Sequence, residues 1–174
     1  MRAELPLMAW LAMAAPTACQ RDERAVEAPA LTAREYSERI ASARAAVERD
    51  PRDRRAWIEL GNDYFDTQRR AEAVEAYASA LELEPDDPDV LTDQGIMLRE
   101  LGAFDRALAN FERANRLQPT HLHSLFNIGV LCASDLHDRA RAVRAWRKVI
   151  DTAPGSPQAE DARRAIDELE GGAR

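Results

Sequence analysis

The sequence is organised around residues 57–85, which read WIELGNDYFDTQRRAEAVEAYASALELEP. Much of this pattern returns thirty-four residues later, and its first half returns once more at the same interval. In that third copy the second half comes one residue late. The matching positions are Trp57, Leu60, Gly61, Tyr64, Ala73, Tyr77, Ala80 and Pro85; then Leu91, Gly95, Leu98, Ala107, Phe111, Ala114 and Pro119; then Leu125, Gly129, Cys132, Ala142, Trp146, Val149 and Pro154. Such a period is typical of stacked repeats.

The recurring glycines indicate how two helices meet within each repeat. Gly61, Gly95 and Gly129 lie inside segments with helical spacing, where glycine costs up to about 1 kcal/mol relative to alanine. Three such glycines at one period predict that the partner helix comes too close for a β-carbon. On that partner helix, small and aromatic residues recur in register: Ala73, Ala107 and Ala142, and Tyr77, Phe111 and Trp146. Each pair leaves an apolar face open, so neighbouring pairs must stack.

Residues 57–85 fill every position of a known signature: Trp, Leu-Gly, Tyr, then Ala, an aromatic residue and Pro. The chain therefore resembles the tetratricopeptide repeat family, whose unit is a helix–turn–helix of about 34 residues. The resemblance extends over residues 54–156. It implies an all-α solenoid of three helix pairs, at residues 54–87, 88–121 and 122–155. The prolines end the second helix of each pair, because proline cannot continue a helix.

Two further helices are expected outside the three pairs. Residues 32–53 form a half-repeat helix, which Thr32 opens with Glu35 in a capping box. Residues 156–174 form a terminal helix and tail, with Ser156 as N-cap. Its exposed face is charged, as the end of a repeat array requires.

The turns between helices carry their own signals. Asp87, Thr120 and Asp138 are the predicted N-caps of the helices that follow them. Gly102 supplies a left-handed residue at the end of a first helix. The extra residue of the third repeat falls in the turn at residues 135–138.

The first residues have the composition of an export signal. Residues 1–18 are predicted to be a signal peptide, with an apolar run at residues 5–15 that is too short to span a bilayer. The stretch resembles a bacterial lipoprotein signal, with Thr17, Ala18 and Cys19 at the end of its cleavage motif. That resemblance implies lipidation of Cys19 and a possible anchor to a membrane.

The alternative is that no signal exists here. The stretch departs from the lipoprotein pattern at Pro16, which stands where the family usually has leucine. The N-terminus is then disordered, or translation starts at Met8 or Met13, and the protein stays in the cytoplasm. Residues 19–31 have mixed charge and no periodicity, and are read as a flexible tether.

Composition and residue spacing exclude several function classes. A net charge of −7 argues against non-specific nucleic-acid binding. His121 and His123 fall on different helix faces, and His137 falls in a turn, so no metal site is predicted. Cys132 takes an apolar core position. No phosphate loop or nucleophile motif is present, so we predict neither an enzyme nor a cofactor.

A binding surface is predicted on the first helix of each pair, which lines the concave side of such a solenoid. Apolar and hydrogen-bonding side chains share the stripe next to the packed one. The candidate peptide-binding residues are Arg55, Ile58, Asn62, Phe65, Asp89, Thr92, Ile96, Arg99, His123, Phe126, Asn127 and Val130. The alternative is that these residues only pack one first helix against the next.

The resemblance implies a non-enzymatic scaffold that holds a peptide or helix of a partner protein in the groove. The first repeat and the residues from Ala145 to Pro154 are similar to periplasmic modules that assist cytochrome c maturation, and lipidated relatives act as envelope assembly factors. Some members clamp a C-terminal carboxylate. Here only Asn62 fits that clamp, because Ile58 and Asp93 stand at its other positions. A self-associating structural module is the alternative of another class.

Overall fold

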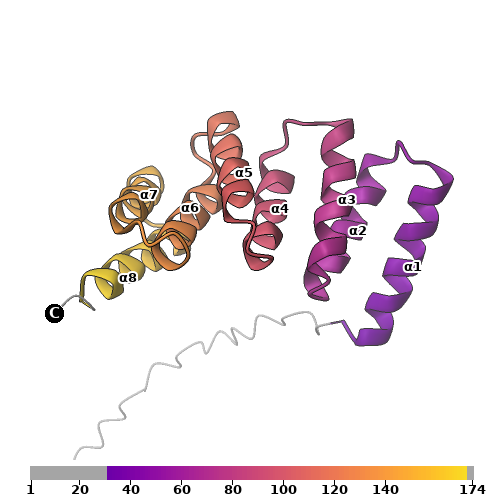
Figure 1. The fold of residues 1–174 in the computed structure, drawn as a ribbon, viewed down its shortest axis with the longest axis horizontal. Helices are drawn as coiled ribbons and strands as arrows, with labels where there is room; N and C mark the ends of the chain where they lie inside the picture. Colours follow the sequence, from indigo (N-terminus) through magenta and orange to yellow (C-terminus); the bar gives the residue numbers. More distant parts are fainter. Residues whose placement is uncertain (1–30, 172–174) are drawn as a thin grey trace, which may run out of the picture. The chain divides into compact units, whose positions relative to one another are not determined.

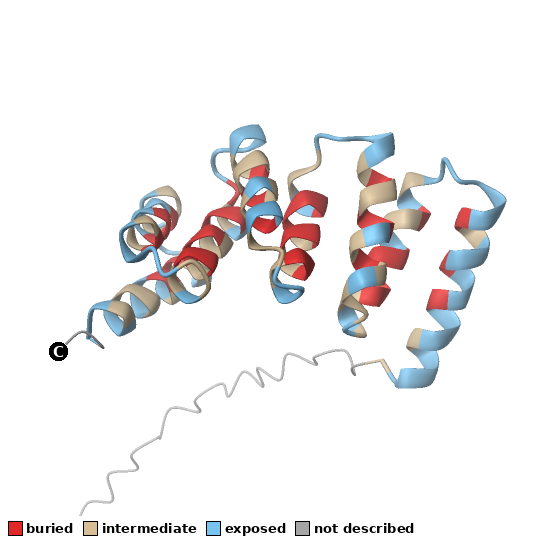
Figure 2. Cartoon of the chain, in the orientation of Figure 1, coloured by how far each residue is buried: buried red, intermediate tan, exposed pale blue. Residues whose placement is uncertain are grey.

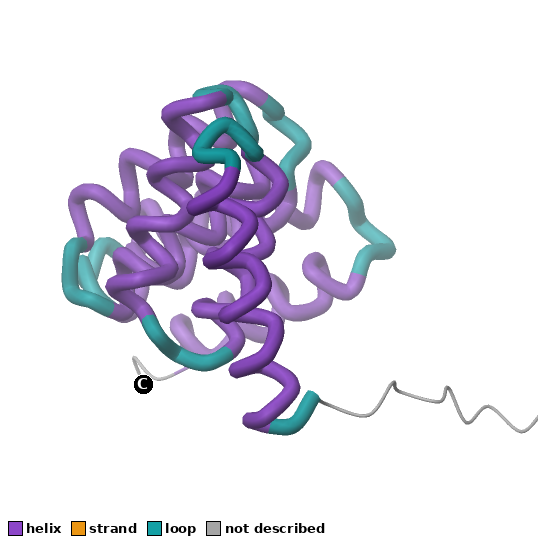
Figure 3. The backbone as a smooth tube through the Cα atoms, turned by 90° about the vertical axis from the view of Figure 1, so that its right-hand side faces the viewer, coloured by secondary structure: helices purple, strands orange, loops and turns teal. Residues whose placement is uncertain are grey.

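The computed structural model describes residues 31–171, and this part of the chain is all helical (Figure 1). The predicted signal peptide, Cys19 and nearly all of the predicted tether lie outside these residues. The helices are α1 (Ala33–Arg49), α2 (Arg54–Asp66), α3 (Arg70–Leu83), α4 (Pro88–Glu100), α5 (Phe104–Leu117), α6 (Leu122–Ser134), α7 (Arg139–Thr152) and α8 (Pro157–Gly171). Within the described residues, Figure 3 shows helices joined by short loops, and no strand. The all-α prediction is confirmed.

Three helices, α1, α4 and α7, start at caps predicted from the sequence. Thr32 and Glu35 form the complete capping box of α1, with the Thr32 side chain accepting from the Glu35 backbone N–H. The Asp87 carboxylate accepts from two backbone N–H groups at the start of α4, and Asp138 caps α7 through the N–H of Arg141. These side chains satisfy amide groups that have no partner within the helix.

One predicted cap is wrong. The N-cap of α6 is His121 rather than Thr120, and its ring Nδ1 accepts from the backbone N–H of Ser124 at 3.3 Å. His121 is 6% exposed, whereas Thr120 faces solvent, so the buried imidazole takes the place expected for a hydroxyl. The ring also has Nε2 3.0 Å from a carboxylate oxygen of Asp89, which holds it in place.

The turns also follow the sequence. Gly102 has a φ of 77°, as expected of the residue that ends α4. His137 has a φ of 55° in the turn that contains the extra residue. That turn is closed by a hydrogen bond from the N–H of Asp138 to the carbonyl of Cys132.

Each pair is held together where an aromatic ring of the second helix covers a glycine of the first. A β-carbon on Gly95 would lie 2.6 Å from Cε1 of Phe111, and one on Gly61 would lie 2.5 Å from Cε1 of Tyr77. Gly129 faces the ring of Trp146 in the same way. The close approach predicted from the sequence is thus an approach of ring to backbone. The red residues of Figure 2 gather between the helices at these contacts.

Packing continues from one pair to the next. Val74 and Ile96 contact both the apolar cluster of the first half and that of the second half, so the two clusters form one continuous core. At the N-terminal end, α1 contributes Ile40, Ala43 and Val47 to this core. It therefore behaves as the second helix of an incomplete repeat.

The last described helix packs against the third pair. Ala159 and Ala162 of α8 are fully buried, and Ile166 and Leu169 pack on the core in part. Arg164 stands thirty-five residues after Gly129, at the position where the other first helices carry glycine. It is exposed.

Candidate functional site: a groove along the first helices

The first helices of the pairs form the more closely spaced row of the array. The backbones of α2 and α4, of α4 and α6, and of α6 and α8 are in contact. No such contact joins α3 to α5 or α5 to α7. A stack whose one row is tighter curves towards that row, so the first helices line the inner side. This is the side on which the sequence places the candidate binding residues.

The apolar candidates are neither buried nor fully exposed. All of them have intermediate exposure: Ile58, Phe65, Ile96, Phe126 and Val130. Each also packs against the buried core of the first or second half of the chain. These side chains therefore both join neighbouring helices and leave part of their surface open, and their role in peptide binding stays a prediction.

The polar candidates from the first helix pair are available on the surface. Asn62 is exposed, and its Oδ1 accepts a hydrogen bond of 2.8 Å from the Tyr77 hydroxyl. This contact fixes the amide orientation and directs the NH2 group away from Tyr77. Arg55 is exposed and lies 2.8 Å from Glu59 on the same helix, a surface pair that solvent weakens.

The second pair contributes less than expected. Thr92 is 2% exposed, and its hydroxyl donates to the Pro88 carbonyl within α4, so it offers no surface to a partner. Arg99 lies 2.5 Å from Asp135, which anchors its guanidinium towards the third pair. Asp89 is exposed and faces the buried ring of His121.

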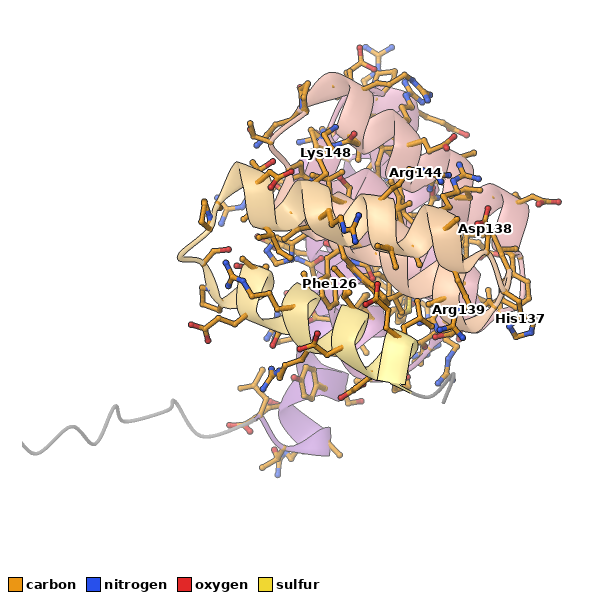
Figure 4. The ribbon with its side chains drawn as sticks, turned by 90° about the vertical axis from the view of Figure 1, so that its left-hand side faces the viewer. Phe126, His137, Asp138, Arg139, Arg144 and Lys148 are labelled. Atoms are coloured by element: carbon orange, nitrogen blue, oxygen red, sulfur yellow. The ribbon has the colours of Figure 1, made fainter. Side chains whose placement is uncertain are left out.

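The third pair presents a mixed surface. The Asn127 amide donates to the His123 carbonyl at 2.9 Å, within the same helix. The ring centroid of Phe126 lies 6.2 Å from that of Trp146, whose indole N–H donates to the Phe126 carbonyl. Figure 4 shows Phe126 at this end of the array, with Arg144 and Lys148 on the side of α7 that faces away from α8.

The structure adds a residue that the candidate set lacks. A pocket of about 300 Å³ opens between α2 and α4, and it is lined by Asn62, Phe65, Asp66, Tyr77 and Asp93. The sequence singled out Asp93 only as unsuitable for a carboxylate clamp. It lies on α4 between the predicted stripe and the core, so its spacing alone gave no sign that it faces a pocket.

Asp93 is held in an environment that disfavours its charge. Burial is the main cause that raises the pKa of its carboxyl group to about 6, from an ordinary 3.8. The nearby carboxylates of Asp89, Asp87 and Asp66 raise this pKa further, while His121 acts in the opposite direction. The pocket therefore contains a carboxylate that burial and neighbouring acids both destabilise.

No reactive constellation accompanies this groove. Residues 31–171 contain no cluster of three or more His, Cys, Asp or Glu side chains able to hold a metal ion. Cys132 is fully buried, and burial raises the pKa of its thiol, so it packs as a small apolar residue. Among the helices described here, none is long and apolar enough to cross a bilayer.

Known proteins resemble this chain through their repeats. It is 33% identical over 101 residues to human tetratricopeptide repeat protein 4, covering 55% of this chain and 26% of that protein. It is 26% identical over 103 residues to Hsp70-Hsp90 organizing protein 2 of Arabidopsis thaliana, covering 59% of this chain and 18% of that protein. The chain thus spans about a quarter or less of the length of these relatives.

Solved structures share the fold. The crystal structure of MamA superposes with a TM-score of 0.74 at 19% identity, covering 80% of this chain and 79% of that one. The first TPR domain of Spaghetti (RPAP3), bound to the HSP90 peptide SRMEEVD, superposes with a TM-score of 0.63 at 18% identity, covering 71% of this chain and 95% of that one. At these identities the likeness concerns the fold alone.

The family model for the tetratricopeptide repeat matches residues 30–88 and 58–121. Together these matches cover more than half of the chain, from α1 to the end of the second helix pair. The third pair, with its extra residue in the turn, lies beyond them. Repeat period, glycine–ring contacts and this match agree, and the chain belongs to the tetratricopeptide repeat family.

Proposed function

We propose that this protein is a non-enzymatic scaffold that holds a peptide or helix of a partner protein along its first helices. The observation that carries this proposal is the row of half-exposed apolar side chains on the inner side, formed by Phe65, Ile96 and Phe126. A stripe that met only water would be polar. Apolar anchors with a few hydrogen-bonding groups beside them suit an amphipathic segment.

Members of this family mediate protein–protein interactions, which supports the general proposal. A carboxylate clamp is not part of it. The HSP90 peptide SRMEEVD in the RPAP3 structure is acidic near its C-terminus. In this chain, Ile58 and Asp93 stand where such a peptide would need basic or amide groups. A partner of other chemistry is therefore expected.

The proposed place of action is the envelope of a bacterial cell. This part of the proposal depends on residues 1–19, which read as an export signal that ends at a cysteine suited to lipidation. A tethered scaffold on the periplasmic face suits an assembly or maturation factor. Mass spectrometry of the N-terminus of the native protein tests it, because an unmodified Met1 would assign the protein to the cytoplasm instead.

The binding test compares two sets of serine substitutions. The groove variant carries serine at Phe65, Ile96 and Phe126. The matched control carries serine at three exposed leucines outside the groove: Leu83, Leu101 and Leu117, which are 40%, 50% and 41% exposed. Both are expressed in the native host, crosslinked and purified, and their partners are quantified by mass spectrometry. Circular dichroism then checks that each stays helical.

We expect the groove variant to lose at least about nine-tenths of a specific partner, which corresponds to about 1.4 kcal/mol of binding free energy. The control should keep it. If a helical groove variant captures the same partner at an unchanged level, the groove is not the binding surface. Loss in both variants would point to a different apolar surface, and would equally count against the proposal.

Self-association is the alternative in another class, and the last helix argues against it. The face of α8 that a second helix would have to cover carries Glu160, Arg163, Arg164 and Asp167. An arginine at the glycine position blocks the approach that Phe111 makes to Gly95. We therefore expect sedimentation velocity to show a monomer at all concentrations tested, and a concentration-dependent shift would favour the alternative.

A further inference from the structure

We propose that the pocket between α2 and α4 accepts the positively charged side chain of an arginine or lysine in the bound segment. This inference rests on the proposed function and specifies the chemistry of the partner at one position of the groove. The pocket is lined by Asn62, Phe65, Asp66, Tyr77 and Asp93, which come from three helices of the first two repeats.

The pocket has the shape and composition that a long cationic side chain requires. Its volume of about 300 Å³ exceeds that of one side chain, so the pocket need not deform to admit one. Phe65 supplies an apolar wall for the methylene stem of the side chain. The carboxylates of Asp66 and Asp93 supply the acceptors.

The polar atoms of the pocket are arranged before a ligand arrives. The Tyr77 hydroxyl donates its proton to Asn62 Oδ1 at 2.8 Å, so towards a ligand its oxygen can act only as an acceptor. Among residues 31–171, the Asp66 carboxylate accepts one side-chain hydrogen bond, a long one of 3.3 Å from the Tyr36 hydroxyl. Within the described residues, Asp93 forms no ion pair. The pocket therefore offers carboxylate acceptors that form no ion pair with any of the described residues.

The neighbouring arginines are engaged elsewhere. Arg54 pairs with Asp87 at the start of α4, and Arg70 lies 2.6 Å from Glu100 at its end. Arg99 lies 2.5 Å from Asp135 of the third repeat. None of these pairs includes Asp66 or Asp93, so these three arginines do not neutralise the pocket.

The environment of Asp93 supports the same reading. A half-buried carboxylate without an ion-pair partner costs free energy, and an asparagine of the same shape would avoid that cost. The raised pKa of Asp93 reflects this cost. A cation from a partner would offset this cost. We therefore expect binding to change the electrostatic environment of Asp93 more than that of the other pocket residues. An acidic side chain in the same place would be repelled.

The experiment selects peptides from a phage-displayed library of random 12-residue sequences on the full protein at pH 7.5. The bait variants are Asp66→Lys, which changes an exposed residue and leaves packing intact, and Asp93→Asn. The Phe65, Ile96 and Phe126 serine variant serves as the groove control. Circular dichroism confirms the fold of each bait before selection.

We expect the wild-type protein to enrich peptides with arginine or lysine at one fixed position relative to their apolar residues, by about tenfold over the library. Asp93→Asn should reduce this preference, and Asp66→Lys should replace it by a preference for aspartate or glutamate. Both variants should still select the apolar residues, because the anchors in the groove are unchanged.

The outcomes separate this inference from the proposed function. If peptides depend on the groove residues but show no basic preference, or if Asp66→Lys leaves that preference unchanged, the pocket does not bind a cation although the groove binds peptides. If the serine variant selects the same peptides as the wild type, the groove itself is not the binding surface and the proposed function fails first.

Discussion

Replacing Gly95 by alanine tests the contact that makes each repeat compact. The new β-carbon would lie 2.6 Å, 2.9 Å and 3.1 Å from three ring atoms of Phe111. That ring is fully buried, so it cannot swing into solvent to make room. The helices must separate, or the ring must leave its preferred rotamer.

Two opposing effects set the magnitude. Alanine is favoured over glycine inside a helix by about 1 kcal/mol. Overpacking a well-filled core typically costs about 1–3 kcal/mol, and the short distances here place Gly95→Ala near the upper end. We therefore expect a net loss of about 2 kcal/mol in the free energy of unfolding. For a domain of this size that corresponds to a fall of about 4–8 °C in melting temperature.

The assay is urea unfolding followed by far-ultraviolet circular dichroism, with whole curves compared because repeat arrays can unfold in several steps. Gly155→Ala is the matched control, since no atom lies within 4 Å of its β-carbon position. It should stay within about 0.5 kcal/mol of wild type. In a Phe111→Leu background, Gly95→Ala should become neutral or stabilising, because the clashing ring is gone.

If Gly95→Ala is as stable as the wild type or more stable, the ring does not exclude a β-carbon, and the glycine would need another explanation. Equal loss in Gly155→Ala would show that the effect is not specific to the ring contact.

Three further predictions follow from buried groups. Asp93→Asn should raise the free energy of unfolding at pH 7.5 by about 1–2 kcal/mol. A carboxyl whose pKa is raised on folding contributes fully to stability below its unfolded pKa, and this contribution is lost as the pH rises through about 6. Urea melts at pH 3.5 should therefore show no gain. Arg39→Ala should cost about 1–3 kcal/mol, because the Asp63 carboxylate, with 2% side-chain exposure, loses a cation 2.5 Å away; adding Asp63→Asn should recover most of the loss in the same melts. Cys132 should react with iodoacetamide at least about tenfold more slowly in the folded protein than in guanidinium, as measured by peptide mapping, and equal rates would contradict its burial.

The sequence predicted the repeat because its key contacts are local in register. In the first two pairs the glycine and the aromatic residue that covers it are sixteen positions apart, as Gly95 and Phe111 are. In the third pair one inserted residue increases this interval to seventeen, from Gly129 to Trp146. A fixed interval of this kind is visible without coordinates. The helix ends could also be predicted from the sequence. Asp87 caps α4 through backbone N–H groups a few residues away, and Gly102 ends α4 through its own backbone conformation.

The misplaced cap and the missed pocket have a different origin. His121 became the cap of α6 because Asp89, thirty-two residues away, holds its ring in place. The pocket around Asp93 forms only when α2 and α4 stand side by side over Tyr77. Neither fact depends on helical spacing within one segment. Contacts between repeats determine both the cap and the pocket, and the sequence pattern of a single repeat does not predict such contacts.

The same distinction decides which residues can report on binding. Ile96 contacts the cores of both halves, so its replacement weakens the array as well as the groove. Asp66 is exposed, and Asp93 adds cost rather than support to the free protein. Packing does not require either carboxylate. A change in partner choice on altering them is therefore evidence about the groove itself, whereas a loss of binding on altering Ile96 needs a measurement of stability beside it.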